Sequence, residues 1–143
     1  MKKIVMVFLI GFLMPIGQAG AAVKHYNVVT LGKTVVVPVE SVDTPEARAK
    51  GLQERQQLFG GMLFIHQQPE KLRYWMKGMK IPLDMIWIDA DKKIVDISKN
   101  VPVCTADPCP AYHPKVLAQY VLEVNAGFVA KHNVKKGMTV NFS

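Results

Sequence analysis

The chain lacks an apolar run long enough to span a lipid bilayer. Its longest such run, residues 4–16, falls short of the roughly 20 residues that a membrane helix needs. Two lysines precede this run and small residues at 17–22 follow it, in the order typical of a secretory signal peptide. We therefore expect residues 1–22 to be a cleaved signal peptide. The mature protein should lie in the periplasm or be secreted, without stable membrane insertion after cleavage.

Acidic residues are outnumbered, with 11 Asp and Glu against 18 Lys and Arg and a net charge of +7. The basic residues are nevertheless scattered, and beyond residue 22 they form doublets only at Lys92-Lys93 and Lys135-Lys136, where turns are expected. A nucleic-acid surface needs positive charge gathered on one face of the protein. We therefore expect no nucleic-acid partner.

Cysteine is also scarce, and the chain contains only Cys104 and Cys109. An even number of cysteines in a secreted protein indicates pairing, so we expect a structural disulfide between them. A redox-active pair and two free thiols are the alternatives, but the spacing is not the C-x-x-C of redox sites. The disulfide would pin a proline-containing loop and leave the core to hold the fold.

No motif of a familiar enzyme class occurs. The serines lack a G-x-S-x-G setting, and there is no glycine-rich phosphate loop, no H-E-x-x-H and no cluster at zinc spacing. We expect no cofactor and no metal within the domain. Two weaker metal hypotheses remain: thioether ligation of Cu(I) by Met62, Met76, Met79 and Met85, and a Cu(II) or Ni(II) site at a mature terminus beginning Val23-Lys24-His25.

Short β-branched and apolar runs dominate residues 23–143, which we expect to form a single domain. They predict a mainly β fold with minor α content, an antiparallel β-sandwich or barrel-like domain with one or two short helices. The expected strands are residues 27–31, 34–40, 62–65, 72–76, 83–88, 94–97, 118–124 and 138–142.

Four local signals refine this prediction. Gly32-Lys33 between the first two runs indicates a hairpin, and Pro38 predicts that the second strand lies at a sheet edge. Residues 43–51 begin with polar residues, a proline and an acid and end with a glycine, which predicts a short helix. Residues 128–132 predict a second helical turn that ends at an asparagine.

The block of residues 74–89 is the most unusual part of the chain. It combines two Trp, three Met and two Lys with an isolated acid, Asp84, inside an apolar run. A carboxylate placed there must be paired or hydrogen-bonded, and Arg55 or Lys77 are available partners. A structural ion pair or turn-capping role and a functional carboxylate both remain open for Asp84.

Aromatic residues near this block offer a second kind of site. Strand alternation places Tyr74 and Trp75 on opposite faces, so at most one of them points into the core. Trp75 and Tyr112 are candidates for a binding surface, because their rings combine apolar area with a polar group; core packing is the alternative. Asp84 and Glu123 are candidates for a carboxylate pair of the glycosidase kind, which needs a defined separation.

Several blocks of the chain occur in an order that resembles the family called domain of unknown function 192. They are residues 43–52, residues 61–64, Trp75-Met76-Lys77 with Ile81-Pro82-Leu83-Asp84, residues 109–112 and residues 120–127. The resemblance implies a compact, mainly β, sandwich-like domain. It implies no reaction, because none is established for the family.

The leading hypothesis is a periplasmic binding domain that recognises a small molecule or a cell-envelope component at the turn from Met76 to Asp84. Its candidate ligand-binding residues are Arg55, Trp75, Lys77, Asp84 and Tyr112. One alternative is a small envelope hydrolase in which Asp84 acts as acid or base and Arg55 or Lys77 stabilises charge. Another is a periplasmic copper or metal-binding protein. Whether the protein is an enzyme stays open, and we expect a monomer.

Overall fold

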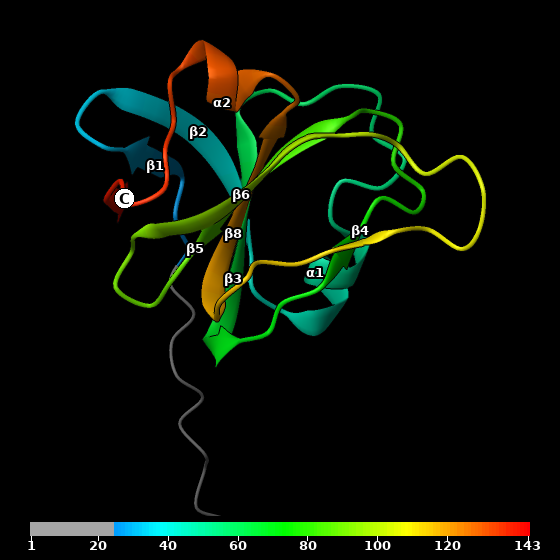
Figure 1. Ribbon diagram of the computed structural model, residues 1–143, viewed down its shortest axis with the longest axis horizontal. Coiled ribbons are helices and arrows are strands. Elements are labelled where there is room, and N and C mark those ends of the chain that lie inside the picture. The colour runs from blue at the N-terminus through cyan, green and yellow to red at the C-terminus, as the bar shows by residue number, and fades with distance from the viewer. Residues whose placement is uncertain (1–24) are drawn as a thin grey trace, which may run out of the picture.

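The computed structural model describes residues 25–143, so the predicted signal peptide lies outside the described residues. Within residues 25–143, no helix has the length and apolar character needed to cross a membrane. Seven of the nine strands form one curled sheet in the order β6-β5-β8-β3-β2-β1-β9, and a two-stranded sheet, β4-β7, lies beside it (Figure 1). The predicted mainly β fold with two short helices is confirmed.

The elements have the following bounds: β1 (Val28–Leu31), β2 (Val35–Val42), α1 (Pro45–Lys50), β3 (Gly61–Glu70), β4 (Tyr74–Trp75), β5 (Leu83–Ile88), β6 (Ile94–Val101), β7 (Ala111–Tyr112), β8 (Ala118–Asn125), α2 (Phe128–Lys131) and β9 (Val140–Phe142). All strand pairs are antiparallel except β2 and β3, which run parallel.

The predicted hairpin is confirmed as β1 and β2, but the prediction that Pro38 marks a sheet edge is wrong. Strand β2 lies between β1 and β3 in the sheet. Pro38 is the last residue of β2 that pairs with β1, opposite Val28, and pairing with β3 starts only at Val39, opposite Gly61. The proline therefore sits where β2 passes from one partner to the next, and its missing N–H interrupts neither ladder.

Helix α1 follows the local signals in the sequence. The Thr44 side chain accepts a hydrogen bond from the Ala47 backbone N–H at 3.1 Å, Pro45 is the first helical residue, and Gly51 ends the helix with a φ of 46°. A Cβ on Gly51 would lie 3.2 Å from the Phe64 ring, so glycine serves both the turn and the close approach to β3. This fixes α1 beside β3.

The two faces of the curled sheet carry two separate apolar clusters. Along β8, Leu122 and Val124 point to the cluster that includes β1 and β9, whereas Val121 points to the cluster beneath β4 and β7. All six residues of β5 are buried because both of its faces are covered. Side chains on neighbouring positions of β5 and β8 therefore enter different compartments.

Strand β4 does not pair with β5, although only a short basic turn separates them. Its partner is β7, which the sequence analysis missed, with Tyr74 opposite Tyr112 and Trp75 opposite Ala111. Two residues are too few to show a periodic pattern. This small sheet covers the second cluster and carries the Pro-containing loop that precedes β7 (Figure 1).

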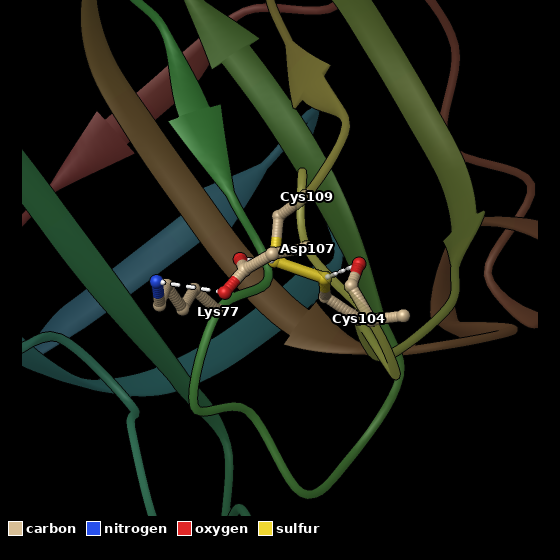
Figure 2. The surroundings of a disulfide bond; sticks show 5 residues. Lys77, Cys104, Asp107 and Cys109 are labelled. Atoms are coloured by element: carbon tan, nitrogen blue, oxygen red, sulfur yellow. Dashed lines mark hydrogen bonds and ion pairs between the residues drawn. A yellow bond between two sulfur atoms is a disulfide. The ribbon is translucent and has the colours of Figure 1, made fainter.

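The predicted disulfide between Cys104 and Cys109 is confirmed. It closes the loop before β7, and within that loop Asp107 Oδ2 lies 3.3 Å from Lys77 Nζ (Figure 2). The disulfide closes the loop on itself, and the ion pair joins the loop to the turn that follows β4.

Replacing both cysteines by serine should lower the free energy of unfolding by only about 2 kcal/mol, because the closed loop is short. Both apolar clusters remain intact in that variant, so it should still fold cooperatively. Urea unfolding of the variant and the parent measures the difference. Loss of a cooperative transition would show instead that the loop supports the core.

Candidate functional site

A hollow of about 220 Å³ opens between α1 and β4. Helix α1 and the residues after it form one wall, β4 and the turn that follows it form the other, and residues of β3 and β8 complete it. The lining residues are Arg48, Ala49, Lys50, Gly51, Leu52, Gln53, Phe64, His66, Arg73, Tyr74, Trp75, Lys77, Met79 and Glu123.

Arg48 ties the α1 wall to the sheet. Its Nη1 donates hydrogen bonds to the backbone carbonyls of Asp43 and Ile65, the latter at 3.0 Å. These bonds anchor the helix at the middle of β3. The wall is therefore held by the side chain of a residue that also lines the hollow.

Glu123 is the buried acid of the hollow. It lies on β8 directly between Met62 of β3 and Met85 of β5, and only 4% of its surface is exposed. No group within residues 25–143 forms a hydrogen bond with its carboxyl. Burial raises the pKa of this carboxyl to about 8. At neutral pH the group is therefore mainly protonated and can donate a hydrogen bond into the hollow.

A hydrogen-bonded chain of three side chains lies beside Glu123. Tyr74 Oη is 3.0 Å from His66 Nε2, and His66 Nδ1 is 2.8 Å from Glu70 Oε1. Burial, with the positive charge of Arg48, lowers the pKa of His66 against the opposing effect of Glu70. The neutral His66 imidazole donates a hydrogen bond from Nδ1 to the Glu70 carboxylate. Its Nε2 therefore accepts a hydrogen bond from the Tyr74 hydroxyl.

Tyr74 and Trp75 divide as strand alternation predicts. The Tyr74 ring packs edge-on against Phe64 and Trp87, at 5.2 and 5.4 Å between ring centroids, and burial raises the pKa of its hydroxyl. Trp75 points outward and is 58% exposed. One aromatic residue of β4 therefore packs in the core and the other stands at the mouth of the hollow.

Positive charge surrounds this mouth. Lys77 Nζ lies 5.8 Å from the centroid of the Trp75 ring, within cation–π range, and its ion pair with Asp107 is largely exposed. Lys50, at the end of α1, and Arg73, just before β4, are two further exposed cations of this lining. The hollow thus combines a cationic rim and an open indole with a neutral, buried acid.

Asp84 lies outside this hollow, and the predicted pairing with Arg55 or Lys77 is wrong. The Asp84 carboxylate accepts hydrogen bonds from the backbone N–H of Asn100 at 2.7 Å and of Val129 at 2.8 Å. Arg55 instead forms a two-pronged pair with Glu40, at 2.5 and 2.7 Å, on the exposed surface. This geometry supports the structural role for Asp84, joining β5 to β6 and to the start of α2.

Asp84 and Glu123 cannot act as a glycosidase pair. In the β5–β8 ladder Asp84 is opposite Val124, whereas Glu123 is opposite Met85. Directly opposed residues share a face of the sheet and successive residues alternate, so the two carboxyl groups lie on opposite faces. No single substrate bond can lie between them.

The structure therefore brings together only part of the predicted site. Trp75 and Lys77 line the hollow, whereas Arg55, Asp84 and Tyr112 do not. Glu123 carries the same sequence signal as Asp84, an acid inside an apolar run, but the sequence suggests it only as half of a carboxylate pair. Nothing local indicates Arg48, His66 or Arg73, because separate elements bring them to the hollow.

The four methionines of the Cu(I) hypothesis all pack in the apolar cluster beneath β4 and β7. This packing supports their role as core residues. Within residues 25–143, no three His, Cys, Asp or Glu side chains gather into a possible metal site. The alternative site at a mature N-terminus includes residues 23 and 24, which lie outside the described residues.

A family model named DUF192, described as "Uncharacterized ACR", matches residues 27–142. A protein of unknown function from Novosphingobium aromaticivorans DSM 12444 shares 29% identity at a TM-score of 0.74, over 80% of this chain and 83% of that one. A protein from Sinorhizobium meliloti 1021 named a "putative transcription regulator" shares 31% identity at a TM-score of 0.75, over 83% of this chain and 96% of that one. No curated protein matches the chain.

Proposed function

This chain belongs to the uncharacterised DUF192 family, and from its own geometry we propose that it binds a small anionic ligand in the hollow between α1 and β4. The proposal keeps Trp75 and Lys77 from the predicted site. It replaces Asp84 with Glu123 as the central acid, and it leaves out Arg55 and Tyr112.

The buried carboxyl of Glu123 is the observation that carries this proposal. Buried polar groups in folded proteins are almost always hydrogen-bonded, because an unpaired one costs free energy. Glu123 has no such partner within residues 25–143, and its oxygens open onto the hollow that the residue lines, since Asp43 Oδ2 is the one fully enclosed side-chain polar atom there without a hydrogen bond. A ligand with a hydrogen-bond acceptor, such as a hydroxyl or carbonyl oxygen, would supply the missing partner.

The mouth of the hollow indicates the charge and size of the ligand. Lys50, Arg73 and Lys77 favour an anionic group, and the exposed Trp75 ring offers a flat surface on which a sugar or other ring can stack. A volume of about 220 Å³ lies below the roughly 300 Å³ at which drug-sized pockets begin. We therefore propose a ligand of about one ring with one negative charge.

Glucuronate and glucose form a matched pair of probes, because they share the ring and differ in the carboxylate. Glucuronate should bind more tightly, and Trp75→Ala or Lys77→Gln should each weaken its binding roughly tenfold through the loss of stacking or of charge. Saturation-transfer NMR titrations measure these affinities at neutral pH.

Arg55→Gln is the control for this experiment, since it removes an exposed cation that lies outside the hollow. It should leave glucuronate binding unchanged. Equal binding of the two sugars, or an equal loss in Arg55→Gln, would contradict the proposed recognition of an anion by this hollow.

A second candidate function is hydrolysis with Glu123 as a general acid. A pKa of about 8 keeps this carboxyl protonated at neutral pH, which suits proton donation to a leaving group. If the protein is an enzyme, Glu123→Gln should bind the ligand and fail to turn it over. Recovery of the bound ligand unchanged after prolonged incubation with the parent protein would leave binding as the function.

We also propose that the protein acts in the periplasm or outside the cell. The signal-peptide pattern of residues 1–22 supports this location, and so does the disulfide, which persists in oxidising compartments. Intact-mass measurement of the exported protein tests it through the position of the new N-terminus. The monomeric state stays a prediction.

A further inference from the structure

A second and wider hollow of about 690 Å³ lies between the segment that follows β3 and the segment that leads from β7 into β8. Three exposed cations, Lys71, Arg73 and Lys115, line it together with Leu72, Val116 and Leu117. We refer to these six residues as the basic-apolar surface. Arg73 also lines the first hollow, so the two hollows adjoin.

The apolar part of this surface is unusually open. Val116 is 53% exposed and Leu117 is 49% exposed, and Trp75, near Arg73, is 58% exposed. These are three of the five large hydrophobic side chains that are exposed within residues 25–143. Exposed apolar groups gathered in one region indicate a surface that contacts a partner.

The charge around these groups selects the partner. No acidic residue lines the second hollow, and Lys71, Arg73 and Lys115 form no ion pair within residues 25–143. Glu70, which precedes Lys71, is engaged with His66, and Asp96, which accepts from the Lys115 backbone N–H, is paired with Lys136. The cations of the basic-apolar surface are therefore available to an anionic partner.

We infer that this surface docks the protein on the face of an anionic phospholipid bilayer. Cations that surround exposed aliphatic side chains match a membrane interface, where phosphates lie above the first methylene groups. Trp75, exposed in the adjoining hollow that also contains Arg73, is a residue type typical of this depth. The contact is peripheral: Val116 and Leu117 reach the acyl boundary while the sheet stays in water, which agrees with the absence of a spanning helix in residues 25–143.

Vesicle co-sedimentation tests this inference, with the protein recovered from expression of the full chain and the same N-terminus in every variant. Vesicles with about one-third phosphatidylglycerol should bind at least tenfold more tightly than pure phosphatidylcholine vesicles, and the difference should shrink at high salt. Lys71→Gln with Lys115→Gln should weaken binding about 25-fold, at about fivefold per charge. Val116→Ser with Leu117→Ser should weaken it at least tenfold.

Two matched controls use residues away from this surface. Phe59 is 82% exposed and precedes β3, at the opposite end of that strand from Lys71; the strand ends pair with Val124 and Ala118 of β8, roughly 20 Å apart. Phe59→Ser, and Lys33→Gln with Lys135→Gln, should leave vesicle binding unchanged. Equal binding to both kinds of vesicle, or equal losses in the controls, would overturn the inference. Tighter binding to duplex DNA than to vesicles, abolished by the Lys71 and Lys115 changes, would also overturn it in favour of nucleic acid.

Discussion

Glu123→Gln should raise the free energy of unfolding at pH 8.5 by roughly 3 to 5 kcal/mol over that of the parent protein. Burial raises the pKa of Glu123 from 4.5 to about 8 in the folded chain. The unfolded chain loses this proton near pH 4.5, whereas the folded chain holds it until about pH 8. The protonated Glu123 carboxyl therefore makes its full contribution to the free energy of unfolding below pH 4.5. This contribution is lost as the pH rises towards 8.

Glutamine keeps the shape of the protonated acid and does not titrate, so the variant should lose this pH dependence. Near pH 4 the two proteins should have similar free energies of unfolding. Urea unfolding at pH 4, 6 and 8.5 measures both profiles, and Glu46→Gln, an exposed acid of α1, is the control that should follow the parent. Parallel profiles for Glu123→Gln and the parent would show that the folded protein stabilises the Glu123 carboxylate.

Asp84→Ala should lower the free energy of unfolding by about 3 to 5 kcal/mol, because it leaves two backbone N–H groups without their acceptor. These are the N–H groups of Asn100 and Val129, at 2.7 and 2.8 Å from the two carboxylate oxygens. Asp84→Asn should cost less, about 2 kcal/mol, since it keeps one acceptor oxygen but turns an amide N–H₂ towards the other donor. Urea unfolding at neutral pH measures both variants.

Arg55→Met and Lys77→Met supply the comparison, because both were predicted partners of Asp84. Their ion pairs with Glu40 and Asp107 are exposed, so each change should alter the free energy of unfolding by less than about 1 kcal/mol. A loss in either variant as large as that of Asp84→Asn would show that the cation and Asp84 are coupled.

The basic-apolar surface and the first hollow share Arg73, so the two sites adjoin. Docking through Val116 and Leu117 would hold the mouth of the first hollow close to the membrane surface. The vesicle experiment uses variants that do not line the first hollow, so either proposal can fail alone.

Local sequence signals determined those parts of this protein that depend on neighbouring residues. The cap at Thr44, Pro45 and Gly51 places α1, the Gly32-Lys33 turn sets the first hairpin, and alternation separates Tyr74 from Trp75. The apolar runs located all the longer strands, because burial of an alternating or continuous face requires such runs. The two lone cysteines similarly determined the disulfide.

Only the tertiary structure decided which strands adjoin and which face each polar residue occupies. Pro38 lies inside the sheet because β2 changes partner there, and β4 pairs with β7, which follows β5 and β6 in the chain. Asp84 and Glu123 carry the same local signal, an acid in an apolar strand. Because of the register of β5 against β8, Asp84 faces backbone donors and Glu123 faces the hollow. Pairing between distant segments sets that register, and the sequence around either acid does not indicate it.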